Sequence, residues 1–93
     1  MDEFVVYILY SEKYDRLYIG YSSASISRYH WHNSKSHKGF TLKYRPWKMI
    51  HVEFFQRKSD ALAREKVLKG GKGREWLRKV VLLEMINAGF ISA

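Results

Sequence analysis

One carboxylate lies on what would be the apolar face of a helix in the second half of the chain. Ala61, Leu62 and Leu68 are spaced so that they share this face with Glu65. An acid in such a position is costly unless it is paired or holds a cation. Two interpretations follow. Glu65 forms a buried ion pair with Arg28 or a neighbouring lysine, or it binds a hard cation such as Mg²⁺, which needs only one or two carboxylates besides phosphate oxygens.

Two basic side chains earlier in the chain have the spacing of a phosphate-binding pair. Arg28 and His32 are four residues apart, so they would project from one face of a helix. The Arg28 guanidinium can bind phosphate through two hydrogen bonds at once, which a lysine cannot reproduce. His32 could contact phosphate or move a proton, or it could be an ordinary solvated histidine. The remaining histidines have no spacing that indicates a zinc site: His30, His37 and His51.

The N-terminal part of the chain is predicted to form a β-hairpin. Residues 4–10 (FVVYILY) are a continuous apolar run, typical of a strand covered on both faces. Residues 16–21 (RLYIGY) form a second strand, and the polar residues 11–15 make the turn that pairs the two strands antiparallel.

Three residues of this hairpin could have a role beyond packing. Gly20, near the end of the second strand, indicates a close backbone approach or a bend. Tyr7 and Tyr18 lie on the two paired strands. The pattern alone describes them as core residues with satisfied hydroxyls, since that is the usual state of a buried tyrosine.

The rest of the chain is predicted to contain helices and one more strand. The expected elements are a helix over 24–33, a basic loop over 34–46, a strand over 47–55, and helices over 60–69 and 73–87. Ser59 would cap the helix over 60–69, and Gly70-Gly71 would end it. The predicted fold class is α/β (α+β): a small mixed three-stranded sheet with a β-hairpin, flanked by helices in the order β-β-α-β-α-α. Residues 1–93 are expected to form one domain.

Composition favours a polyanionic partner. The net charge is +8 and the pI about 9.8, and residues 16–52 contain no aspartate or glutamate. Lysine and arginine that neutralise phosphates release counterions, so such a stretch favours nucleic-acid binding. Cysteine is absent, Asp2 and Glu3 precede the first apolar run, and no apolar run is long enough to span a bilayer. We therefore expect a cytoplasmic location and no membrane partner.

Taken together, these residues resemble the GIY-YIG nuclease family. Its two signature elements correspond to Val5-Val6-Tyr7 and Tyr18-Ile19-Gly20, although only the tyrosine of the first survives. Arg28, His32 and a helical glutamate, Glu65, follow in the family's order. Features shared with short stand-alone members extend the resemblance over about residues 4–80: His32-Asn33, Thr41, Pro46, Ala61 and Glu65-Lys66. An asparagine that some longer members carry after the glutamate has only Asn87 as a late counterpart.

The resemblance implies an endonuclease that hydrolyses phosphodiester bonds, with DNA as the expected substrate. Glu65 would hold one Mg²⁺ or Mn²⁺ ion, and Arg28 would stabilise charge growing on the phosphoryl oxygens. Tyr7 would activate the attacking water once the cation and Arg28 favour its ionised form. Tyr18 would position the phosphate or assist the proton transfer, and His32 would support the reaction.

Nucleic-acid binding is expected to involve the hairpin and the basic loop. The predicted contact residues are Gly20, Lys35, Lys38, Lys43 and Arg45. No DNA-binding extension of the kind found in homing or repair relatives is attached, so specificity would come from this domain or from a partner protein. Two alternatives stay open: a non-catalytic basic nucleic-acid-binding module of the same fold, and an interaction protein whose basic face serves an acidic protein.

Overall fold

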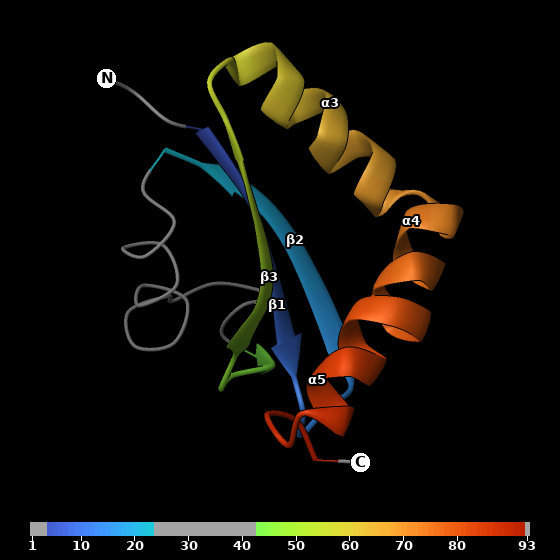
Figure 1. The fold of residues 1–93 in the computed structure, drawn as a ribbon. Helices are drawn as coiled ribbons and strands as arrows, with labels where there is room; N and C mark the ends of the chain where they lie inside the picture. Colours follow the sequence, from blue (N-terminus) through green and yellow to red (C-terminus); the bar gives the residue numbers. More distant parts are fainter. Residues whose placement is uncertain (1–3, 24–42, 93) are drawn as a thin grey trace.

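The computed structural model of the protein describes residues 4–23 and 43–92, and a three-stranded sheet lies at its centre. The strands are β1 (Phe4–Ser11), β2 (Arg16–Ser22) and β3 (Lys48–Phe55). Their order is β2-β1-β3, and both pairings are antiparallel. The predicted α/β fold class is confirmed, with helices flanking the sheet (Figure 1). The helix expected over 24–33 and most of the basic loop lie outside the described residues.

Strand β1 is central because its side chains are apolar on both faces. Val6 and Ile8 enter the larger core cluster, which faces the helices, while Val5 and Leu9 enter a smaller cluster on the opposite face. All four side chains are at most 3% exposed. A strand with two buried faces has no polar side on which to meet water, so it must lie between neighbours. The expectation that residues 4–10 form a strand covered on both faces is confirmed.

The β1–β2 turn is tied to the C-terminal half of the chain by Asp15. This residue adopts a left-handed backbone conformation with φ 54°, which aspartate tolerates better than most residues. Its Oδ1 accepts hydrogen bonds of 2.8 Å from the Tyr10 hydroxyl and from Arg78. Burial, together with the hydrogen bond to Asp15, raises the pKa of Tyr10 to about 12. The hydrogen bonds from Arg78 and Tyr10 lower the pKa of Asp15.

The helices follow β3 and lie along one face of the sheet (Figure 1). They are α3 (Lys58–Lys69), α4 (Gly71–Trp76), the π-helical turn η2 (Leu77–Leu82) and α5 (Leu83–Asn87). Ala61, Leu68 and Leu77 are at most 1% exposed and belong to the larger core cluster, together with Val6 and Ile8 of β1. No helix in the described ranges has the length and apolar character needed to cross a bilayer.

The start of α3 differs from its expected position. Arg57 has an extended backbone and precedes the first helical residue, and no side chain caps the helix. The expectation that Ser59 is the N-cap is wrong, because Ser59 lies inside the first turn. Only Gln56 and Arg57 separate the end of β3 from the first residue of α3. This short connection and the burial of Ala61 set the start of the helix.

Glycines at the end of α3 let the chain turn directly into α4. Gly70 ends α3, as expected from the sequence, and its N–H donates to the carbonyl of Val67 at 3.1 Å. Gly73 lies so close to the last turn of α3 that a Cβ there would collide with the backbone of Val67 and Leu68. A side chain at this position would therefore push α4 away from α3.

Candidate active site

Tyr7 and Gly20 face each other across the β1–β2 pair. They are register partners in the antiparallel ladder, and Tyr7 is 1% exposed. An ideal Cβ on Gly20 would lie 2.5 Å from both Cζ and Oη of Tyr7. The phenol end of Tyr7 therefore occupies the space above the Gly20 backbone. The close backbone approach expected at Gly20 is confirmed, and the atom that approaches belongs to Tyr7.

Tyr18 lies beside Tyr7 on the same face of the sheet. The two ring centroids are 6.3 Å apart, and the rings are tilted by 31°. Trp47, only 1% exposed, also packs against Tyr18, with the two ring centroids 6.1 Å apart. Aromatic pairs at these distances and angles are mutually attractive and hold each other in place. The face opposite the helices thus gathers the two tyrosines that the sequence singled out.

Glu65 is placed on α3, and a lysine of the same helix pairs with it. Lys69 Nζ lies 3.2 Å from Glu65 Oε2, the spacing of an i,i+4 pair. Ala61 and Leu68 are buried as the helical pattern predicted, whereas Leu62 is 40% exposed. Glu65 therefore sits at the border of the apolar stripe, where its side chain keeps 19% of its exposure. The first interpretation, an ion pair with a neighbouring lysine, is confirmed in part, since the pair is only half-buried.

The donor chemistry at Glu65 is compatible with a divalent ion. Within residues 4–23 and 43–92, no group of three or more histidine, cysteine, aspartate or glutamate residues is placed to hold a metal. A closed all-protein site is thus not formed by this part of the chain. Mg²⁺ binds by preference through one or two carboxylates, with waters and phosphate oxygens as the other ligands. A single partly exposed carboxylate fits that requirement.

Lys43 and Arg45 lie just before β3, on a basic and aromatic part of the surface. Lys43 Nζ lies 5.3 Å from the centre of the Tyr44 ring, and the Arg16 guanidinium lies 5.4 Å from the same ring. The hydrogen bond from Arg16, with a further one from Lys43, lowers the pKa of Tyr44. Tyr44 also packs against the cluster that contains Tyr7 and Trp47. Lys43 therefore lies on the tyrosine side of the sheet, which is the face opposite the helices that holds Tyr7 and Tyr18.

The sequence predicted four further site residues. Arg28, His32, Lys35 and Lys38 lie outside the described residues. Their predicted roles stay predictions.

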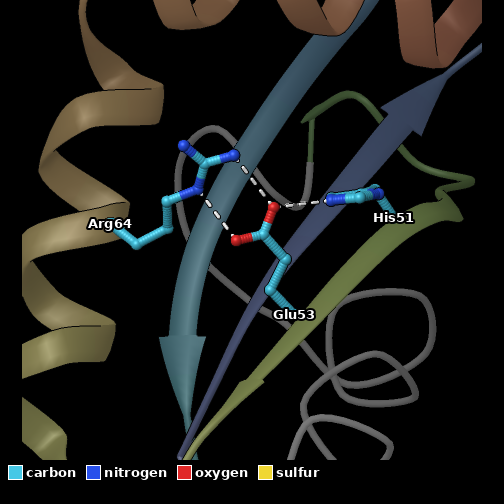
Figure 2. A network of polar contacts seen from close by, with 3 residues as sticks. All are labelled: His51, Glu53 and Arg64. Atoms are coloured by element: carbon cyan, nitrogen blue, oxygen red, sulfur yellow. Dashed lines mark hydrogen bonds and ion pairs between the residues drawn. The ribbon is translucent and has the colours of Figure 1, made fainter.

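A polar network on the helix side of the sheet was not expected from the sequence (Figure 2). Glu53 of β3 accepts hydrogen bonds from Arg64 of α3 at 2.8 and 3.0 Å, and its Oε2 lies 2.8 Å from Nε2 of His51. Burial raises the pKa of Glu53, but the hydrogen bonds from Arg64 and His51 outweigh it, so the net pKa lies below its usual value. Trp76 stacks under Arg64, 5.4 Å from ring centre to guanidinium. This network fastens α3 to the edge of the sheet.

The fold and the site define a class: a small basic α/β domain whose antiparallel sheet holds two tyrosines on one face and carries a helical glutamate. Comparison with known families gives the matching description, the GIY-YIG catalytic domain, over residues 3–79. The chain belongs to the GIY-YIG family. No curated protein and no solved structure matches it. Membership indicates a nuclease-type function in general, with nucleic acid as the substrate that is cleaved.

Proposed function

We propose that this protein is a metal-dependent endonuclease that hydrolyses phosphodiester bonds in DNA, with one Mg²⁺ or Mn²⁺ ion held by Glu65. The observation that carries the proposal is the arrangement of Tyr7 over Gly20 and beside Tyr18. These are the tyrosines and the glycine of the two family signature elements, on paired strands. The half-buried carboxylate of Glu65 supports the assignment of the ion.

Each side chain has a defined task in this mechanism. Tyr7, in its ionised form, accepts a proton from the water that attacks phosphorus, and Gly20, which has no side chain, leaves room for the end of the ring. Tyr18 orients the phosphate. Arg28 stabilises the negative charge that grows on the phosphoryl oxygens, and His32 supports the proton transfers. When bound, the metal ion supplies Lewis-acid polarisation of the scissile phosphate and stabilises the leaving oxygen.

A direct test compares substrates and metals on the purified protein. Branched, nicked, single-stranded and duplex DNA, and matched RNA, are incubated with Mg²⁺, Mn²⁺ or EDTA, and products are separated on denaturing gels. We expect DNA cleavage with either metal, none in EDTA, and none with Glu65→Gln. Glu75→Gln is the control, because Glu75 also pairs with a lysine four residues later, at 3.4 Å, on the exposed face of the helices.

Three results would contradict the proposal in different ways. Cleavage in EDTA would show that the reaction does not need a metal ion. Cleavage of RNA and not of DNA would show that the substrate is RNA. Salt-sensitive DNA binding without cleavage under any metal would favour the non-catalytic binding module instead. A partner protein that supplies sequence or structure specificity is part of the proposal only if the purified chain cleaves all the DNA forms alike.

A further inference from the structure

A shallow groove separates β2 from the junction of α3 and α4. Its volume is about 230 Å³, and it is lined by Leu17, Tyr18, Ile19, Lys69 and Arg74. Pockets that enclose whole small molecules are usually larger than about 300 Å³. The groove therefore has room for one compact chemical group, not for a cofactor. It opens beside Tyr18, on the edge of the sheet formed by the described strands.

The charged side chains that line the groove are two cations, Lys69 and Arg74. Lys69 is half exposed, and its one acidic neighbour in the described ranges is Glu65. Arg74 donates from Nε to the carbonyl of Lys69 at 3.0 Å, and no carboxylate pairs with it in the part of the chain that the structure describes. That hydrogen bond holds the guanidinium to the end of α3 through Nε alone. The two terminal nitrogens of Arg74 are then left for a ligand that accepts two hydrogen bonds.

The chemistry of such a ligand is that of a phosphodiester. Arginine presents parallel N–H groups that match two phosphate oxygens, and a nearby ammonium adds a compact positive charge. The position agrees with this choice, because Tyr18 lines the groove and Lys69 also contacts Glu65. A phosphate in the groove would thus lie next to Tyr18 and to the lysine that pairs with Glu65.

We propose that this groove binds a phosphate of the nucleic-acid backbone next to the scissile one, with Lys69 and Arg74 as its ligands. The inference rests on the proposed nuclease function and extends it to residues outside the acid-free stretch. It makes the α3–α4 junction part of the substrate path. The Gly70 turn that brings Arg74 back to the end of α3 then has a binding role as well as a structural one.

The test measures duplex DNA binding in EDTA, so that it does not depend on cleavage. The variant is Lys69→Gln with Arg74→Gln, and the matched control is Lys58→Gln with Lys79→Gln. The control removes the same charge from exposed helix positions, and Lys79 has an i,i+4 glutamate partner just as Lys69 has. Lys58 begins α3 and Lys69 ends it, so the two lie on the order of 15 Å apart.

The expected readout is the slope of log affinity against log salt. Each neutralised phosphate contributes about 0.9 to this slope for B-DNA, so the groove variant, which loses one phosphate, should flatten it by about 0.9. The control should change it by less than half as much. Lys69→Arg should keep the wild-type slope, and each single Gln variant should lose about half of the effect. If circular dichroism shows that the double variant is unfolded, the single variants are used for the test instead.

Equal slope changes in the groove variant and the control, or no change in either, would overturn the groove assignment while leaving the nuclease proposal standing. The nuclease proposal fails separately if the wild-type protein cleaves no nucleic acid with either metal. The two failures are distinguishable because the groove assignment is tested by comparing the variants with a wild-type protein that binds DNA normally.

Discussion

The hydroxyl end of Tyr7 fills the position that a side chain on Gly20 would need. A Cβ on Gly20 would come within 2.5 Å of Tyr7 Oη and within 2.9 Å of Cε2, closer than real Cβ atoms approach other atoms. The two residues are opposite partners in β1 and β2, so the strand register itself sets the contact. A glycine at position 20 is thus the condition for placing the Tyr7 phenol where it lies.

We expect Gly20→Ala to destabilise the protein and to impair cleavage together. The added methyl group must push the buried Tyr7 ring aside, and overpacking of this kind typically costs about 1–3 kcal/mol. Gly71→Ala is the control, because nothing lies within 4 Å of a Cβ at that position. The control should be neutral or slightly stabilising in urea titrations. An unchanged free energy of unfolding for Gly20→Ala would show that the Tyr7 ring is not fixed against Gly20.

Tyr7→Phe should separate a packing role from a catalytic one. The ring remains, so the free energy of unfolding should fall by no more than about 0.5–1.5 kcal/mol for the lost hydroxyl contacts. If Tyr7 is the general base, cleavage should fall by about 10²–10⁴-fold with DNA affinity unchanged. The wild-type rate should rise with pH through neutrality, and the residual rate of the variant should lack this rise. Normal cleavage by Tyr7→Phe would transfer the role to Tyr18 or His32.

Glu65→Gln should fold almost normally and lose metal-dependent cleavage. The Lys69 pair is half exposed, and i,i+4 pairs on helices contribute only about 0.3–0.5 kcal/mol. A buried ion pair would instead cost about 3–5 kcal/mol when broken. Thermal melting with and without Mg²⁺ tests both parts: the ion should raise the melting temperature of the wild type and not of the variant. A variant that still cuts would remove Glu65 from the site.

Replacing Lys38, Lys43 and Arg45 with Ala should flatten the salt dependence of DNA binding by up to three phosphate contacts, each worth about 0.9 in slope. Lys43 lies on the tyrosine side of the sheet, close to Tyr44, which favours a direct contact. The charge-matched control replaces three exposed helix lysines: Lys58, Lys66 and Lys79. A slope that is unchanged, or no flatter than that of the control, would count against the loop.

Glu53→Gln should destabilise the protein near neutral pH by about 1–2 kcal/mol, less than a fully buried pair because Arg64 and Glu53 keep part of their exposure. The folded-state pKa of Glu53 is lowered, so its stabilising effect is complete above the unfolded-state pKa of about 4.3 and is lost as pH falls through the folded value. The stability difference between wild type and variant should therefore shrink below about pH 4. A difference that stays constant down to pH 2 would exclude a contribution from the Glu53 charge.

The sequence by itself predicted the three strands and the helices after β3, which are the elements of the described residues. The unbroken apolar run at 4–10 predicted a strand covered on both faces, and the glycines at 70 and 71 predicted the end of α3, because the apolar content of a segment and the backbone freedom of glycine are local properties. Tyr7 and Tyr18 were singled out as site residues by the resemblance to the family's signature elements, and Glu65 by its place on an apolar helix face as well as by that resemblance. The start of α3 was not predicted, because the exit from β3, not a capping serine, sets it.

Only the tertiary structure decided which side chains meet. The contact of Tyr7 with Gly20 depends on strand register, and a shift by one residue would turn Tyr7 to the helix side. Lys69 could have been found as the i,i+4 neighbour of Glu65, but nothing local brings Arg74 to the same groove. The Glu53–Arg64 bond likewise joins residues on different elements. Such contacts arise from how helices dock on the sheet, which depends on the packing of the whole core and not on any one segment.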